Sequence, residues 1–216
     1  MSGTEIWLVR HGETAWNADG RWQGHTDTEL SPAGLKQARR LAERLRGQGF
    51  AAVYTSDLRR AAQTAVTVAA ALAGRPPVVE DARLREIHVG EMAGLTTAEG
   101  VARGIFRRPM AFDEPFPGGE SRAAQVGRVT DALREVAERH RNGRVLAVGH
   151  GGTVGAGLSG LLGIDEETYQ GVFGRLANVS ITRLRQNEDG SWRVLVFNDT
   201  AHLEGAAVAS RSEPVF

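Results

Sequence analysis

The chain has 216 residues with 26 basic and 26 acidic side chains, a formal net charge of zero, and no cysteine. Without cysteine there is no disulfide, no cysteine-ligated metal and no thiol nucleophile, and a neutral charge balance argues against a nucleic-acid or acidic-membrane binder. A chain of this length fits one domain that buries its own core without a metal or disulfide.

The apolar residues are distributed as in a soluble globular protein, at 41% of the chain with 24% charged residues. Residues 1–5 lack the basic-then-apolar pattern of a secretory signal peptide. No window reaches the roughly 18 apolar residues that a membrane helix needs. We therefore expect a cytoplasmic protein with no membrane and no nucleic-acid partner.

The first part of the chain alternates short apolar runs with helical periodicity. The apolar runs predict strands at 5–10, 51–55 and 78–79. Ser31 and Pro32 have the pattern of an N-cap followed by proline at the first helical position. The helix that they begin is closed by Gly47 and Gly49, and a second helical pattern covers 57–73.

The second part begins with a stretch at 91–121 that is rich in glycine and proline and has no clear period. It is expected to be an insertion or cap of short helices. Beyond it the patterns predict a helix at 122–141, a buried strand at 144–149, a glycine-rich helix at 152–162 and a hairpin-like pair at 179–184 and 192–198. The tail at 203–216 has little pattern and is expected to be loose.

Strands that alternate with helices indicate an α/β protein with helices on both faces of the sheet. We expect a three-layer α/β/α sandwich with a mostly parallel central sheet and a small helical cap insertion. The chain shows no repeat and no linker, so residues 1–216 are expected to form one domain.

Polar residues capable of chemistry follow the predicted strands. They are Arg10 and His11 after 5–10, Arg60 after 51–55, Glu86 after 78–79, and His150 with Gly151 after 144–149. In open α/β sheets, ligands bind at the carboxyl ends of the strands. The sequence therefore predicts that two histidines, two arginines and a carboxylate meet at one edge of the sheet.

This set of side chains suits a phosphoryl group. Guanidinium groups match phosphate oxygens bidentately and stay charged, and amides at a helix start after Gly151 favour an anion. In a chain without cysteine, a neutral imidazole is the best metal-free nucleophile near neutral pH. The sequence has no HExxH and no dense carboxylate cluster, so no metal site is predicted.

The run from Leu8 to Thr14 with Trp16 and Asn17 resembles the signature of the histidine phosphatase superfamily, also called phosphoglycerate-mutase-like. The similarity continues in order through Gln23-Gly24, 56–61, 84–86 and 149–151.

The resemblance implies roles for individual residues. His11 matches the nucleophile that forms a phosphohistidine, and Glu86 matches the acid that protonates the leaving group and then activates water. The residues matched to phosphate contacts are Arg10, Arg60, His150 and Asn17. Gln23, Gly24, Gly151 and His88 are expected on the substrate-binding side. The resemblance implies no cofactor and no metal.

The resemblance leaves three functions to weigh. A phosphatase is favoured because 94–119 is compact and has no tyrosine or lysine, whereas the bisphosphoglycerate-dependent phosphoglycerate mutases carry a longer, basic and tyrosine-containing stretch there. The mutase is the alternative. A binding protein without activity predicts loss of His11, an arginine or Glu86, and none is lost. Residues 90–94 depart from the family by lacking a tryptophan and a second glutamate.

The expected substrate is a small phosphorylated metabolite, either a sugar phosphate or a phosphorylated organic acid. Trp22, His25, His88 and the segment 106–116, with Arg107, Arg108 and Phe112, are expected to line the leaving-group side. Short strings resemble glucosyl-3-phosphoglycerate phosphatases; metal-independent phosphoserine phosphatase, α-ribazole phosphatase and a broad-specificity enzyme remain alternatives. The resemblance also allows a homodimer through an edge strand or the final hairpin.

Overall fold

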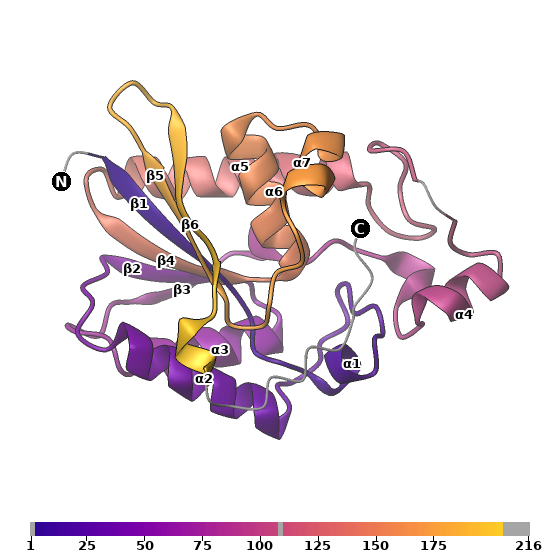
Figure 1. Ribbon diagram of the computed structural model, residues 1–216, viewed down its shortest axis with the longest axis horizontal. Helices are drawn as coiled ribbons and strands as arrows, with labels where there is room; N and C mark the ends of the chain where they lie inside the picture. Colours follow the sequence, from indigo (N-terminus) through magenta and orange to yellow (C-terminus); the bar gives the residue numbers. More distant parts are fainter. Residues whose placement is uncertain (1–2, 108–109, 205–216) are drawn as a thin grey trace.

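The computed structural model describes residues 3–107 and 110–204, and these form a six-stranded sheet in the order β3-β2-β4-β1-β5-β6 (Figure 1). The strands are β1 (Thr4–Arg10), β2 (Ala52–Thr55), β3 (Val78–Glu80), β4 (Arg144–Gly149), β5 (Ile181–Gln186) and β6 (Trp192–Asp199). Strands β1 to β4 pair in parallel, and β5 and β6 are antiparallel additions at one edge. The mostly parallel α/β sheet is confirmed.

Helices cover both faces of this sheet because the central strands are apolar on both sides. Helices α2 (Pro32–Leu45) and α3 (Arg59–Ala69) lie on one face, and α5 (Arg122–Arg139) and α6 (Gly151–Leu162) lie on the other (Figure 1). Along β1, Ile6 and Leu8 pack into the α5–α6 core, whereas Trp7 and Val9 pack into the α2–α3 core. This alternation makes the three layers that the sequence predicts.

Three shorter helices complete the described part of the chain: α1 (Ala15–Ala18), α4 (Thr97–Ala102) and α7 (Glu166–Val172). Helix α4 belongs to the segment 91–121 and lies outside the three layers, beyond the carboxyl ends of the strands (Figure 1). In the described residues, no helix combines the length and apolarity needed to cross a membrane.

Several predicted boundaries are wrong by a few residues. The strand predicted at 179–184 starts only at Ile181, because Val179 has a φ of 53° and its N–H donates to the carbonyl oxygen of Arg10 at 3.0 Å. Helix α3 ends at Ala69, well short of 73, and α5 ends at Arg139. Of the tail predicted to be loose, Leu203 is buried against the α2–α3 core, and 205–216 lie outside the described residues.

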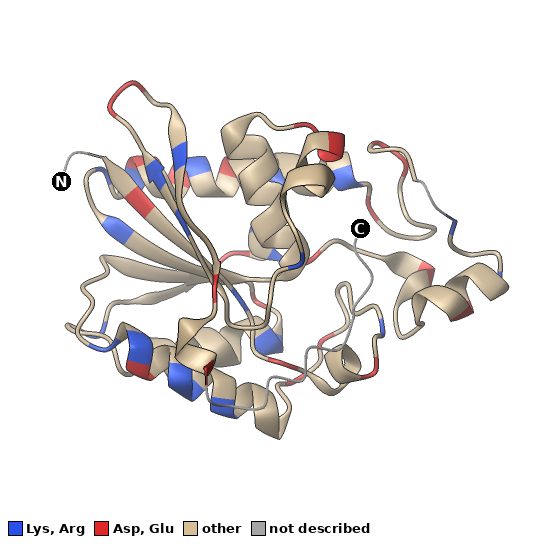
Figure 2. Ribbon diagram, viewed as in Figure 1, with Lys and Arg blue, Asp and Glu red and all other residues tan. Residues whose placement is uncertain are grey.

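A buried carboxylate connects three neighbouring strands of the sheet, β4, β1 and β5. It lies near the amino-terminal end of β1, far from the strand ends that carry His11 and His150. Glu5 of β1 lies in register with Arg144 of β4 and Arg185 of β5, and its side chain is only 5% exposed. Figure 2 shows that acidic and basic residues both occur on the strands of the sheet. Arg185 and Arg183 donate hydrogen bonds to the Glu5 carboxylate, and the Arg183 guanidinium lies 4.3 Å from the centroid of the Trp7 ring. Burial raises the pKa of Glu5, but the hydrogen bonds from Arg185, Trp7 and Arg183 outweigh it and lower this pKa to about 2.

Replacing Glu5→Gln is expected to remove a pH-dependent part of the free energy of unfolding. Because the pKa of Glu5 lies below its ordinary value of 4.5 in the folded chain, its carboxylate stabilises the fold above that pH and the stabilisation is lost as the pH falls to about 2. We expect a loss of about 3 kcal/mol at pH 7. Urea unfolding of the parent and of Glu5→Gln at pH 7 and at pH 3 measures this loss. An equal difference in the free energy of unfolding at the two pH values contradicts the prediction.

Candidate active site

The parallel register of β1 and β4 places two histidines side by side. Arg10 pairs with Gly149 at the ends of the two strands, and the N–H of His11 donates to the carbonyl oxygen of Gly149 at 2.9 Å. The imidazole rings of His11 and His150 follow directly, with centroids 5.1 Å apart and planes at 63°. Both residues are buried, at 2% and 0% exposure. The predicted meeting of the strand ends is therefore present in the structure.

The imidazole of His11 is fixed in one tautomer. Its Nδ1 lies 2.6 Å from the carbonyl oxygen of Gly12, and a carbonyl only accepts, so Nδ1 carries the hydrogen and Nε2 keeps the lone pair of the neutral ring. Burial and the charges of Arg60 and Arg10 hold the pKa of His11 well below its ordinary value of 6.5. At neutral pH the free protein therefore presents a neutral imidazole with an available Nε2.

Two arginines supply the positive charge beside His11. Arg60, in the first turn of α3, is fully buried, and its Nη1 and Nη2 donate to the carbonyl oxygens of Thr26 and Gly24, each at 2.8 Å. Arg10 Nη1 donates to the carbonyl oxygen of Leu176 at 2.6 Å. These bonds to backbone oxygens orient both guanidinium groups, whose geometry and permanent charge suit an oxyanion.

His150 is held in place by a serine that follows β2, the strand next to β4. Its Nε2 lies 2.9 Å from Ser56 Oγ, at the end of β2, while its buried Nδ1 has no hydrogen-bond partner among the described residues. Burial, together with the charges of Arg60, His11 and Arg10, lowers the pKa of His150 well below 6.5. A neutral ring with a buried, unsatisfied nitrogen is suited to contact with a ligand oxygen.

The carboxylate of Glu86 lies at the start of α6. Its Oε2 accepts from the N–H of Gly152 at 3.1 Å, and its Oε1 accepts from the N–H of Ile87 at 2.8 Å and from Gln125 Nε2 at 3.1 Å. A Cβ on Gly152 would lie 2.1 Å from Glu86 Oε1, so only glycine allows this approach. Because Gly152 is two residues from His150, the contact brings Glu86 to the histidine pair.

The loop after β1 holds three more of the predicted residues. Asn17 is buried at α1, where its Oδ1 accepts from the N–H of Thr14 at 3.1 Å. Gln23 Oε1 accepts from Thr14 Oγ1 at 3.0 Å, and the carbonyl oxygen of Gly24 is the one that Arg60 holds. Asn17, Gln23 and Gly24 therefore belong to one hydrogen-bonded loop that is anchored to Arg60.

The last two predicted residues lie on either side of Glu86. Gly151 is the first residue of α6, and a Cβ on it would lie 3.7 Å from Arg10 Nε, which places the helix start beside that arginine. The ring of His88 lies against that of His25, with centroids 4.6 Å apart, and His25 Nε2 lies 2.8 Å from the carbonyl oxygen of Glu86. Burial lowers the pKa of His25.

The aromatic residues expected on the leaving-group side form a small core of their own. Trp22, Phe106 and Phe116 are each 6% exposed, and their ring centroids lie 5.6–5.9 Å from one another. These rings pack against one another, and the expectation that they line the leaving-group side stays a prediction. Arg107 is exposed and paired with Glu114, and Arg108 lies outside the described residues.

Four residues that support the site carry no role in the sequence analysis: Ser56, Gln125, Arg128 and Asn178. Arg128 Nη2 donates to the carbonyl oxygen of Glu86 at 2.9 Å, and Asn178 Nδ2 donates to that of His11 at 2.9 Å. Gln125 offered a signal, since it is a polar residue four positions before the buried Val129 on the apolar stripe of α5. Arg128 and Asn178 offered none, because their partners are distant in sequence.

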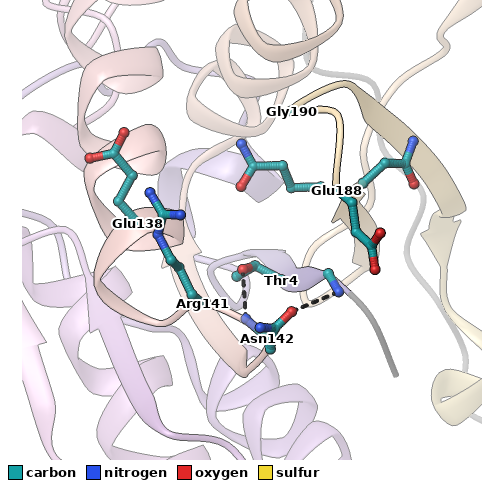
Figure 3. Close-up of a pocket in the computed structure, with 9 residues that line it drawn as sticks. Thr4, Glu138, Arg141, Asn142, Glu188 and Gly190 are labelled. Atoms are coloured by element: carbon teal, nitrogen blue, oxygen red, sulfur yellow. Dashed lines mark hydrogen bonds between the residues drawn. The ribbon is translucent and has the colours of Figure 1, made fainter.

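The chain has a cavity at the opposite end of the sheet, where β1 begins (Figure 3). It has a volume of 340 Å³ and lies between the β5–β6 hairpin and the turn after α5. Asn142 ties its floor together by donating its N–H to Thr4 Oγ1 at 3.2 Å and accepting from the N–H of Gly3. Because no histidine lines it, its side chains offer no counterpart to the His11–His150 pair.

Comparison with known proteins agrees with this geometry. The family profile described as histidine phosphatase superfamily (branch 1) matches residues 6–200. Phosphoglycerate mutase-like protein 4 of Arabidopsis thaliana is 39% identical over 210 residues, covering 93% of this chain and 87% of that protein. A metal-independent phosphoserine phosphatase of the same plant is 37% identical over 218 residues, covering 96% and 87%.

A solved structure adds the fold. A mycobacterial glucosyl-3-phosphoglycerate phosphatase in complex with VO3 superposes with a TM-score of 0.79 at 33% identity, covering 91% of this chain and 99% of that one. The sequence similarity, the shared fold and the paired histidines at the ends of β1 and β4 agree with one another. The chain belongs to the histidine phosphatase superfamily, branch 1.

Proposed function

We propose that this protein is a metal-independent phosphatase that hydrolyses a small phosphomonoester through a phosphohistidine on His11. The observation that carries the proposal is the neutral His11 ring, whose Nδ1 is committed to the carbonyl oxygen of Gly12 and whose pKa is lowered by burial and by Arg60 and Arg10. A neutral Nε2 beside two guanidinium groups combines a nucleophile with the charge that a phosphoryl group needs.

In the first step, the Nε2 lone pair of His11 attacks phosphorus while the bond from phosphorus to the leaving oxygen breaks. Arg10, Arg60 and His150 stabilise the negative oxygens, and Asn17 with Gln23 completes the phosphate contacts. Glu86 gives its proton to the leaving oxygen, which departs as an alcohol. Phosphoryl transfer depends mainly on positioning and charge stabilisation, and the buried hydrogen bonds of Arg60 provide both.

In the second step, water replaces the alcohol. Glu86, now ionised, takes a proton from the water as its oxygen attacks phosphorus, and the bond from phosphorus to Nε2 breaks. The products are inorganic phosphate, neutral His11 and protonated Glu86, so the enzyme returns to its starting state. The N–H groups of Gly152 and Ile87 keep the carboxylate in place through both steps.

The substrate that we propose is a small phosphomonoester that also carries a carboxylate. This is supported by the names of two similar proteins, one a phosphoserine phosphatase and the other a glucosyl-3-phosphoglycerate phosphatase, since both of their named substrates bear that group. In this chain the imidazoles of His25 and His88 lie against each other next to Glu86, on the side where the leaving group departs.

Hydrolysis of p-nitrophenyl phosphate in excess EDTA tests the proposal. The parent protein is expected to keep full activity in the chelator, because arginines replace the charge of a metal. The variant His11→Ala is expected to lose at least about a thousandfold in kcat, since no other nucleophile lies in that position. Loss of activity in EDTA, or full activity in His11→Ala, contradicts it.

The alternative function is phosphoglycerate mutase, which the names of several relatives favour. Incubating the protein with 3-phosphoglycerate and 2,3-bisphosphoglycerate distinguishes the two functions. A phosphatase releases inorganic phosphate without interconverting the monophosphates, whereas a mutase forms 2-phosphoglycerate faster than phosphate. The second result replaces the proposed function with the alternative.

The pH dependence of kcat/KM reports the ionisation of His11 in the free enzyme. His11 attacks only when neutral, so activity falls as the pH drops through its pKa. Because that pKa is lowered, the acidic limb is expected below pH 6.5 after correction for the substrate phosphate, which ionises near pH 6. Since Glu86 has to be protonated, the whole profile is expected to be bell-shaped. An acidic limb that arises from the enzyme and lies above pH 6.5 contradicts this.

A further inference from the structure

We infer that Gln125 and Arg122 are positioning residues that determine which oxygen of Glu86 carries the transferred proton. The inference rests on the proposed role of Glu86 as the acid. It goes further by assigning a task to two residues of α5 that contact neither the reacting phosphorus nor His11, and by predicting which substrates depend on them.

Gln125 connects the two charged side chains. It is fully buried on α5, in line with the apolar residues of that helix. Its Nε2 donates to Glu86 Oε1 at 3.1 Å, and its Oε1 accepts from Arg122 Nη1 at 2.6 Å. A buried amide with a partner at each end has no freedom to turn without losing both hydrogen bonds.

Arg122 sets the orientation of this amide. A guanidinium only donates, so the group of Gln125 that faces it has to be the carbonyl oxygen. The NH₂ group must then face Glu86. The carboxylate of Glu86 consequently meets a hydrogen-bond donor, and Gln125 is unable to accept the proton of Glu86 in its place.

The two oxygens of Glu86 therefore differ. Oε1 accepts from Ile87 N–H and from Gln125 Nε2, which uses both of its lone-pair positions. Oε2 accepts only from Gly152 N–H among the described residues. A proton on Glu86 thus belongs on Oε2, and the arrangement reserves this oxygen for exchange with the leaving group and with water.

Arg122 also fixes the other side of the carboxylate. Its Nη1 donates to the carbonyl oxygen of Gly152 at 2.9 Å, so the same guanidinium holds the residue whose N–H binds Oε2. Arg122 is itself held by Glu166 of α7 at 3.2 Å and lies 5.8 Å from the centroid of the Tyr169 ring. The charge of Arg122 is thereby paired, and it acts on Glu86 only through Gln125 and Gly152.

The experiment compares two leaving groups in the parent and three variants. The variant Gln125→Leu removes the donor, and Arg122→Ala lets the Gln125 amide rotate. The variant Arg122→Lys keeps a donor for the amide oxygen and serves as the conservative rescue. The readouts are kcat for p-nitrophenyl phosphate, whose phenolate leaves without protonation, and kcat for the alkyl ester that the parent hydrolyses fastest among phosphoserine, 3-phosphoglycerate and glycerol phosphate.

We expect a split between the two substrates. Gln125→Leu and Arg122→Ala should lose at least about tenfold in kcat on the alkyl ester, a fraction of the about hundredfold or more that a general acid supplies. On p-nitrophenyl phosphate the loss should stay below about threefold, since that leaving group needs no acid. Arg122→Lys should recover most of the alkyl activity.

The control is Arg134→Ala, which removes an exposed arginine from the same helix and should match the parent on both substrates. Thermal unfolding shows which variants fold. If Gln125→Leu does not fold, the comparison of Arg122→Ala with Arg122→Lys still tests the inference. Equal losses on both substrates, or no loss, overturn the positioning role while the parent's activity upholds the proposed function. A parent that hydrolyses neither substrate overturns both.

Discussion

The register of β1 against β4 is the constraint on which the site depends. Two adjacent parallel strands end in step, with Arg10 opposite Gly149, so the residues that follow them are forced into contact. His11 and His150 therefore meet directly, and a shift of β1 by one residue against β4 would turn the His11 side chain toward the opposite face of the sheet. The remaining groups are placed relative to this pair: Ser56 binds His150 from β2, and Glu86 is held through Gly152.

Burial explains how a neutral histidine and a charged arginine can lie side by side in this site. A histidine in water is partly protonated near neutral pH, and a cationic His11 has no lone pair for attack. Here the low-dielectric surroundings and the charge of Arg60 act in the same direction, so they lower the pKa of His11 while Arg60 keeps its own charge. In the proposed mechanism, the arginine that attracts the phosphoryl group therefore also adds to the effect of burial that keeps the His11 nucleophile neutral.

The sequence predicted the layers and the strand-end residues because both follow from local patterns. The carboxyl ends of parallel strands lie at the same edge of a sheet. Once the strands are predicted, the proximity of Arg10, His11 and His150 can therefore be predicted as well. The rest depends on contacts between distant segments. The bonds of Arg128 to the loop around Glu86 span more than forty residues. The strand predicted from Val179 begins two residues later, at Ile181, because the Val179 N–H donates to the carbonyl oxygen of Arg10. The packing of Trp22 against Phe106 and Phe116 could not be predicted, because both partners lie in an aperiodic segment.

The fully buried guanidinium of Arg60 has a consequence for the reaction's product. Its Nη1 and Nη2 donate to backbone oxygens, and a guanidinium keeps its positive charge at any pH at which proteins fold, so it attracts anions such as phosphate. On the proposed mechanism, we expect inorganic phosphate to bind the folded chain in preference to the unfolded one, which stabilises the fold as phosphate occupies the site. We then expect the product of each turnover to compete with the next substrate, so that the phosphate concentration sets the fraction of active sites that are free to bind substrate.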